Sequence, residues 1–342
     1  MIRGCACVLL VTLAAVINSA QEQSETTRLR TRVVLVDALV KDKLTGAPIE
    51  GLGRDDFRVL ADRKERQISY FSFSRDGTNA KRPLAIVLVL QLWPAGAGRF
   101  LRQPEIPRSL GASLYKLPAD AEVSVIATFV RGVGGNQRQV VGFTRDRKKV
   151  ADALASVPDL VGDHTLSPME TITSVISQVT SRSIEDRPDS KVVIVNVSDG
   201  FDPTNSSERA VSIANLLEAN AMFSCLVCDA KKTVQAGIIA LAPLAAIGQI
   251  NPRGSEHLAV ETGGDIIRVH TPDDYALGLQ QIVNGLKARY TLGFELDDKD
   301  LDDNRVHPLE VQVQHHEGKE AKTTAVVLAR RGYYLPKASA KQ

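Results

Sequence analysis

The chain has few cysteines, few aromatic residues and no excess of one charge. Four cysteines occur in 342 residues, and two of them, Cys5 and Cys7, lie close to the N-terminus. The remaining pair is too small for a disulfide framework, so a hydrophobic core must hold the fold. The net charge is +2 and aromatic residues make up 5% of the chain. This balance indicates no nucleic-acid partner.

Motifs of common catalytic and phosphate-binding sites are also missing. The sequence contains no H-E-x-x-H, no G-x-S-x-G and no G-x-x-x-x-G-K-[ST]. The glycine-rich stretch RGVGGNQRQV, residues 131–140, lies between two expected strands. It therefore predicts a hairpin turn and not a phosphate-binding loop. Since nothing nominates a catalytic group, we predict that the protein is not an enzyme.

Long apolar runs are confined to the N-terminus and to a few expected strands. Residues 1–20 have Arg3 near the start, an apolar segment from Cys7 to Ile17 and the small residue Ala20 before Gln21. This pattern is typical of a secretory signal peptide, and the segment is too short for a stable membrane anchor. We expect cleavage near Ala20, a secreted or periplasmic protein and no membrane span in the mature chain.

The pattern of apolar and polar residues changes twice along the rest of the chain. After a linker at 21–30, residues 31–76 show alternating apolar residues and turn signals, which predict a β module. Residues 82–288 alternate apolar strands with helical segments, and residues 289–336 return to short strands before a tail at 337–342. The two β pieces are each too small for a stable core, so we predict one small β-sandwich with the α/β domain inserted in it. Two separate caps on the α/β domain are the alternative.

The central part predicts a doubly wound, mostly parallel α/β sheet. Segments 84–90, 191–197 and 221–227 are apolar on both faces, as expected for parallel strands covered by helices. Further strands are expected at 121–129, 138–143 and 265–269. Helices are expected within 103–116, at 146–156, 167–182 and 207–219, within 233–262, and at 273–287. Cys225 and Cys228 fall on one such strand, about 10 Å apart and on opposite faces, so we expect free thiols.

Ligands of such sheets bind where loops at the carboxyl ends of strands meet. Three loops are predicted to do so here: the one after Leu90, the one at 161–172 and the one at the end of 192–204. The first carries Gln91, Trp93 and Ala95, the second Thr165, and the third Asp199 in the sequence VVIVNVSDGFDPT.

These residues resemble a von Willebrand factor A (vWA) domain. The whole mature chain is similar to a vWA-related exported family described from acidobacteria, through VVLVDALVKDKLTGAPIEGLGRDDFRVLADRKERQISYFS, VVGFTRDRKKVADAL, VVIVNVSDGFD, ETGGDIIRV, YTLGFEL and ARRGYYLP. The resemblance covers roughly residues 30 to 336. It implies a metal-ion-dependent adhesion site built from an Asp-x-Ser-x-Ser loop, a threonine and an aspartate, at which a protein partner completes the coordination of a divalent cation.

The chain departs from that pattern in its first loop. Gln91 stands at the aspartate position, and Trp93 and Ala95 stand at the two serine positions, whereas Thr165 and Asp199 are retained. Magnesium prefers a set of hard, charged oxygen ligands. We therefore expect a degenerate site that takes neither Mg²⁺ nor Mn²⁺ as a cofactor. Metal binding would require substitute ligands, for which Asp163 and Asp202 are the candidates.

Each of these residues also has a structural interpretation. Asp199 suits the cap of a turn before Gly200, Thr165 and Ser167 suit a helix start, and Trp93 suits packing against helix 103–116. The functional interpretation places a partner-binding edge at Trp93, Arg99, Thr165, Asp199 and Asp202, since exposed tryptophan and arginine dominate interface energies.

The prediction from sequence is an exported, non-enzymatic protein that binds or scaffolds a protein partner without a metal. The alternatives are metal-dependent adhesion through substitute ligands, and a platform subunit of an extracytoplasmic enzyme or assembly. The sequence does not identify the partner.

Overall fold

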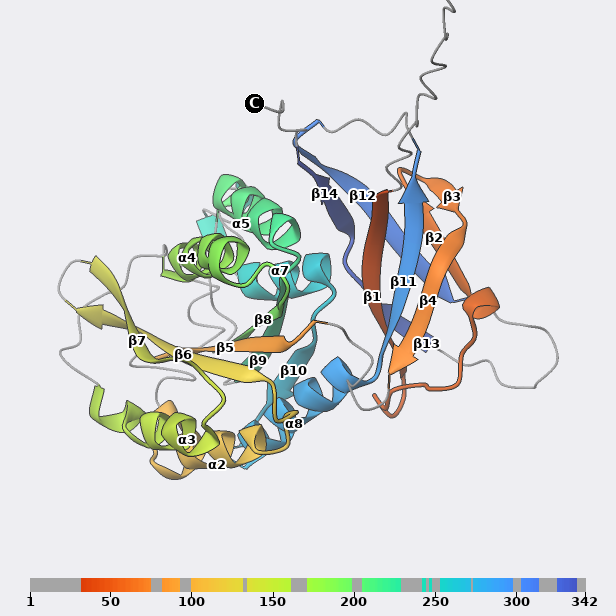
Figure 1. The fold of residues 1–342 in the computed structure, drawn as a ribbon. Helices are drawn as coiled ribbons and strands as arrows, with labels where there is room; N and C mark the ends of the chain where they lie inside the picture. Colours follow the sequence, from red (N-terminus) through yellow and green to blue (C-terminus); the bar gives the residue numbers. More distant parts are fainter. Residues whose placement is uncertain are drawn as a thin grey trace, which may run out of the picture. The chain divides into compact units, whose positions relative to one another are not determined.

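Figure 1 shows the fold of the protein as a computed structural model. The structure describes residues 32–74, 82–92, 100–131, 134–160, 171–198, 205–228, 253–271, 273–297, 303–313 and 325–336, together with 242–243 and 246–247.

A six-stranded sheet forms the centre of the α/β domain. Its strand order is β10-β9-β8-β5-β6-β7. All neighbours are parallel except β6 and β7, which pair antiparallel down to Arg131 and Gly134. The glycine-rich stretch is therefore a hairpin, as predicted. The strands are β5 (Leu84–Gln91), β6 (Glu122–Arg131), β7 (Gly134–Thr144), β8 (Lys191–Ser198), β9 (Met222–Cys228) and β10 (Ile266–Val269).

Helices cover both faces of this sheet (Figure 1). One core cluster joins one face of the strands to α2 (Glu105–Leu114), α3 (Arg147–Ala155) and α8 (Asp274–Lys287). A second cluster joins the other face to α4 (Thr171–Asp186), α5 (Ser206–Glu218) and α7 (Gly254–Thr262). Because β5 and β8 are buried on both faces almost throughout, their continuous apolar sequences reflect two covering layers. The predicted fold class is confirmed.

The N-terminal and C-terminal strands form two four-stranded sheets. One has the order β13-β1-β11-β4 and the other β14-β12-β2-β3. Strand β1 pairs with β11 and β13, and β2 pairs with β12, so each sheet mixes the two ends of the chain. This arrangement agrees with one sandwich and not with two separate caps. The strands are β1 (Arg32–Asp42), β2 (Phe57–Ala61), β3 (Lys64–Arg66), β4 (Ile68–Ser74), β11 (Arg289–Leu296), β12 (Arg305–Val313), β13 (Ala325–Leu328) and β14 (Gly332–Leu335).

Tyr290 lies at the centre of the sandwich core. Its ring stacks on Phe73 with centroids 4.6 Å apart and is tilted against Phe57 at 5.0 Å. Its hydroxyl donates to the carbonyl of Ile49 at 3.0 Å and accepts from the N–H of Leu52 at 3.1 Å. A tyrosine thus fills the apolar core and also holds the β1–β2 connection, because its hydroxyl is satisfied by backbone groups.

Some local expectations were wrong. The loop at 161–172 was expected at the end of a strand, but the described element before it is a short 3-10 helix, η2 (Val157–Leu160). The predicted helix start at 167 lies outside the described residues. Strand β3 was not foreseen; it is reached through Asp62 and Arg63, which have φ of 51° and 63°. Two consecutive positive φ values are typical of a tight hairpin turn.

Ionic contacts connect the sandwich with the α/β domain. Asp37 on β1 lies 2.7 Å from the Nζ of Lys191 at the start of β8. Lys41 pairs with Asp265, which precedes β10. Arg289 donates to the carbonyl of Gly263 at 2.8 Å. No helix in the described part of the chain has the length and apolarity needed to cross a bilayer.

Candidate functional site

The metal-site positions and the partner-binding edge were both predicted at the carboxyl ends of the parallel strands, and Gln91, a metal-site position, is the one of these residues that the structure describes. Gln91 is the last residue of β5, which lies between β6 and β8 in the sheet. The remaining predicted positions lie outside the described residues: Trp93, Ala95, Arg99, Asp163, Thr165, Asp199 and Asp202.

The Gln91 side chain is buried, with 4% of its surface exposed. Its Oε1 has no hydrogen-bond partner among the described residues. Leu92, which follows it, donates its N–H to the carbonyl of Thr128 on β6 at 2.8 Å and continues the parallel pairing by one residue. An uncharged amide is much cheaper to bury than an unpaired carboxylate. Position 91 therefore supplies an oxygen atom but no negative charge to this edge.

A layer of polar side chains lies in the core next to the ends of β8 and β9. Asn196 is fully buried, and its Nδ2 donates to the Oγ of Ser255 at 3.2 Å. The Sγ of Cys225, a buried residue, lies 3.2 Å from the carbonyl oxygen of Ser255. These contacts attach the start of α7 to the sheet. Within the described segments, no three His, Cys, Asp or Glu side chains gather as metal ligands do.

The adhesion-site pattern that the sequence resembles would have a weak donor set for a divalent cation in this chain. Of the five positions in the pattern, only Asp199 carries a charge, Thr165 adds a hydroxyl and Gln91 adds a neutral amide oxygen. Magnesium in proteins is held by one or more carboxylates with waters in a near-ideal octahedron. In the pattern that the sequence resembles, a carboxylate ligand stands at the position of Gln91, whose buried Oε1 belongs to a neutral amide.

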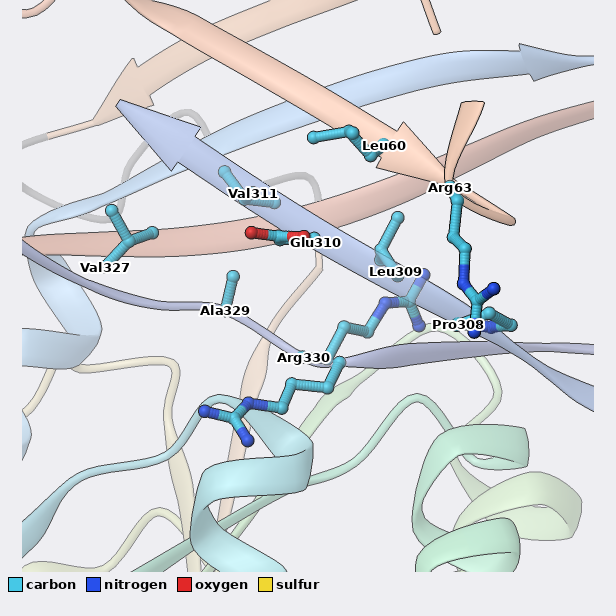
Figure 2. Close-up of a pocket in the computed structure, with 10 residues that line it drawn as sticks. Leu60, Arg63, Pro308, Leu309, Glu310, Val311, Val327, Ala329 and Arg330 are labelled. Carbon is cyan, nitrogen blue, oxygen red and sulfur yellow. The ribbon is translucent and has the colours of Figure 1, made fainter. Parts of the chain in front are cut away.

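A second candidate site lies on the sandwich, and sequence reasoning did not find it. A cavity of about 550 Å³, called the edge cavity below, opens beside β12 (Figure 2). Apolar residues of β2, β12 and the segment after β13 form much of its lining. The charged lining residues are three arginines and one glutamate: Arg63, Arg330, Arg331 and Glu310.

The arginines of the edge cavity differ in their contacts. Arg63 is exposed and forms no ion pair with a described residue. Arg330 donates to the carbonyl of Leu35 at 2.6 Å and to the Oδ1 of Asn220 at 3.0 Å, both neutral acceptors. Burial lowers the pKa of Arg330 to about 10, although the negative charge of Asp37 acts in the opposite direction. At neutral pH the guanidinium remains protonated. Among the described residues, no carboxylate contacts it to balance this charge.

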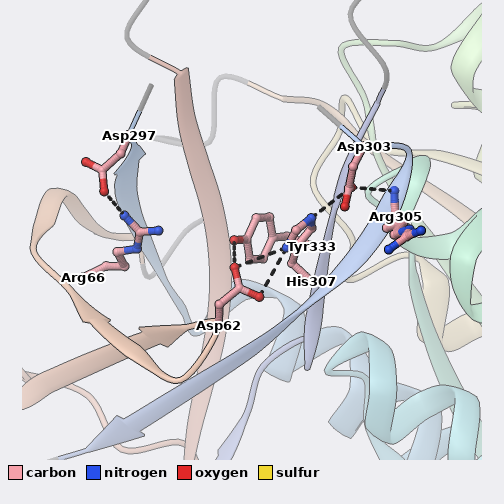
Figure 3. Close-up of polar contacts among 7 residues, drawn as sticks. All are labelled: Asp62, Arg66, Asp297, Asp303, Arg305, His307 and Tyr333. Atoms are coloured by element: carbon pink, nitrogen blue, oxygen red, sulfur yellow. Dashed lines mark hydrogen bonds and ion pairs between the residues drawn. The ribbon is translucent and has the colours of Figure 1, made fainter. Parts of the chain in front are cut away.

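Figure 3 shows a histidine cluster whose members Asp62 and His307 are the sequence neighbours of the lining residues Arg63 and Pro308. The Nδ1 of His307 lies 3.2 Å from the Oδ2 of Asp62, and its Nε2 lies 3.1 Å from the Oδ1 of Asp303. Tyr333 donates its hydroxyl to Asp62 at 3.0 Å and stacks on the imidazole with centroids 5.2 Å apart. Both ring nitrogens are thus engaged by carboxylates, and the cluster connects the β2–β3 turn to β12 and β14.

Comparisons with known proteins find fold similarity alone. No family model matches the chain, and no curated protein matches its sequence. Solved structures similar to it include BatB, a conserved hypothetical protein from Bacteroides thetaiotaomicron, with 14% identity, a TM-score of 0.40 and coverage of 60% of this chain and 100% of that one. A von Willebrand factor type A protein from Catenulispora acidiphila has 9% identity, a TM-score of 0.42 and coverage of 78% and 74%. The manganese-loaded TRAP protein of Plasmodium vivax has 9% identity, a TM-score of 0.38 and coverage of 78% and 98%.

Proposed function

We propose that the protein is an exported, non-enzymatic binding protein whose vWA-like domain holds a protein partner without a bridging metal. The partner meets the carboxyl edge of the six-stranded sheet, around Trp93, Thr165 and Asp199. The observation that carries this proposal is Gln91, a buried, uncharged residue at the end of β5 whose amide oxygen has no hydrogen-bond partner among the described residues.

The chemistry of position 91 supports metal independence. A bridging cation must be attractive enough to the protein to stay bound while a partner carboxylate completes its coordination. Gln91 removes the charge of the first ligand, and Trp93 and Ala95 remove two hydroxyl oxygens. In exchange, the loop presents an indole, the side chain most often found to dominate interface energies. The sequence adds a cationic residue, Arg99, shortly after Trp93.

Thermal unfolding in the presence of Mg²⁺, Mn²⁺ or EDTA tests whether the folded protein binds a divalent cation. A ligand that binds only the folded state stabilises it, by about 2.7 kcal/mol at a hundred times its Kd. The wild-type protein is expected to unfold at the same temperature in all three solutions. The triple variant Gln91→Asp, Trp93→Ser, Ala95→Ser is expected to gain stability from Mg²⁺, and adding Asp199→Ala should remove that gain.

A Mg²⁺-dependent rise in the wild-type unfolding temperature that disappears in Asp199→Ala would contradict the proposal. A folded triple variant without any response to Mg²⁺ would instead show that the three loops do not form one site.

Pull-down from the exported fraction in EDTA tests the binding role. Wild type is expected to capture a discrete protein that Trp93→Ala captures much less. Tyr115→Ala is the matched control, because Tyr115 is an aromatic residue with 56% exposure on the α/β domain, away from the predicted edge. Equal capture by wild type and Trp93→Ala, or capture that requires Mg²⁺, would count against this edge as a metal-free site.

A further inference from the structure

The last described segment of the chain is shared between the two sheets of the sandwich. Strand β13 pairs with β1 in one sheet, and after Ala329 to Arg331 the chain joins the other sheet as β14. Strand β14 covers the edge of β12 only along Arg305–Pro308. The rest of β12, Leu309–Val313, pairs with β2 on its other side. On the β14 side, none of the described strands pairs with this part of β12.

Backbone groups of β12 point toward this open edge. The N–H of Leu309 donates to the carbonyl of Arg331 at 2.8 Å, which is the point where the two segments separate. Backbone groups of a strand alternate in direction, so the N–H and C=O of Val311 point to the same side as the N–H of Leu309. An exposed strand edge of this kind is a template for a further extended segment.

The edge cavity lies against these backbone groups. Leu60, Glu310 and Val311 lie along one side of it, and Val327 and Ala329 lie on the segment that faces β12 (Figure 2). Its volume of about 550 Å³ falls in the range of roughly 300–1,000 Å³ that is usual for ligand sites. The cavity therefore combines a free strand edge with room for side chains.

The charge of the residues that line the edge cavity indicates which kind of ligand it binds. The lining holds three arginines, Arg63, Arg330 and Arg331, and one carboxylate, that of Glu310. The guanidinium of Arg330 is engaged by two neutral acceptors, so Arg63 and Arg331 are the groups left to meet a ligand. Arg331 is 62% exposed and forms a long ion pair with Glu261 at 3.7 Å. Guanidinium groups bind carboxylates through short, charge-assisted and often bidentate hydrogen bonds. The excess of positive charge is complementary to an acidic ligand.

We propose that the edge cavity binds an extended acidic segment of a protein partner, which adds to β12 as a strand at Val311 and places its carboxylates against the arginines. In an added strand alternate side chains face opposite sides. One set then meets the guanidinium groups and the other meets the apolar lining. This site is separate from the carboxyl edge of the six-stranded sheet and does not rest on the function proposed above.

Fluorescence anisotropy with synthetic peptides tests the proposal on the full mature chain. The probe is an eight-residue peptide of alternating glutamate and valine, blocked at both ends and labelled. A second peptide has lysine in place of glutamate, and a third has N-methyl groups on alternate backbone nitrogens. The acidic peptide is expected to bind, the lysine peptide to show no saturable binding, and N-methylation to weaken binding at least tenfold because it removes strand-pairing donors.

A charge-removing variant connects the peptide to the cavity. Arg63→Asn with Arg331→Gln is expected to weaken binding of the acidic peptide at least tenfold. Asparagine tolerates the positive φ of position 63, so the turn is kept. The matched control is Arg108→Gln with Arg138→Gln, which removes two exposed charges from the α/β domain and should leave binding unchanged. Trp93→Ala should also leave it unchanged, which separates this site from the carboxyl edge.

Hydrogen exchange locates the bound peptide. Amide exchange of the segment Leu309–Val313 is expected to slow when the acidic peptide is added and to be unaffected by the lysine peptide.

Four results would overturn the proposal. These are no binding of the acidic peptide at millimolar concentration, equal binding of the N-methylated peptide, equal weakening in the control double variant, and displacement by inorganic phosphate at the same concentration as the peptide. Dimerisation of the wild type that Arg63→Asn with Arg331→Gln abolishes would show that the occupant is a second copy of this chain.

Discussion

Replacing Asp37 by asparagine tests how the sandwich is joined to the α/β domain. The Asp37 carboxylate lies 2.7 Å from the Nζ of Lys191 and accepts a hydrogen bond from the hydroxyl of Thr291 at 2.8 Å. Its side chain is 30% exposed and that of Lys191 is 19% exposed. Burial alone would raise the pKa of Asp37, but the charge of Lys191 and the hydrogen bonds from Lys191 and Thr291 outweigh it and lower the pKa to about 2.

The depressed pKa sets both the size and the pH window of the effect. A shift from 3.8 to about 2 corresponds to about 2.4 kcal/mol of stabilisation of the charged form, since one pKa unit is worth about 1.4 kcal/mol. Solvent screening at this partly exposed pair reduces the expected value to about 1–2 kcal/mol. Because the folded-state pKa is the lower one, this stability is present above about pH 4 and is lost as the pH falls toward 2.

Urea unfolding of the wild type and Asp37→Asn between pH 7 and pH 2 measures the effect. The difference in the free energy of unfolding should be about 1–2 kcal/mol at pH 7 and should shrink toward zero near pH 2, where Asp37 becomes protonated. Glu65→Gln is the control, because Glu65 pairs with Arg58 on the surface with both side chains more than a third exposed; its difference should be much smaller. A difference for Asp37→Asn that stays constant over the whole pH range would refute the reasoning.

Two further substitutions test the packing on which the candidate sites depend. Gly264→Ala should destabilise the protein by about 3 kcal/mol or more in urea unfolding, because the new Cβ would lie 1.8 Å from the carbonyl oxygen of Phe223; an alanine variant as stable as the wild type would contradict this close approach. Tyr290→Phe should cost about 1–2 kcal/mol in the same assay, because it leaves the backbone groups of Ile49 and Leu52 without their buried partner. Hydrogen exchange at Leu52 should then become faster, and unchanged exchange would contradict the assigned role.

The fold was predictable from the sequence because its buried strands consist almost entirely of apolar residues. The apolar segments at 84–90 and 191–197 correspond to β5 and β8, which are covered on both faces. The short strands of the sandwich were found as strands, but their lengths and pairing were less certain. Such strands pair with partners more than two hundred residues away, as β2 does with β12. Strand β3 was missed because its three residues, Lys64–Arg66, are exposed or half-buried and show no apolar pattern.

The two candidate sites differ in how far each can be recognised from the local sequence. The departure predicted at Gln91 could be recognised because the first-loop positions of the resembling pattern come directly after a predicted strand. The edge cavity has no such pattern: Arg63 belongs to a turn between β2 and β3, while Arg330 and Arg331 belong to the crossover between β13 and β14. Only the pairing of β12 with both β2 and β14 brings these residues to one place. The only signal in the local sequence was a pair of adjacent arginines between two short strands. The same pair is equally compatible with a solvent-exposed turn. A site that consists of a free strand edge becomes visible only when every neighbour of that strand is known, and this is why the cavity had to come from the structure.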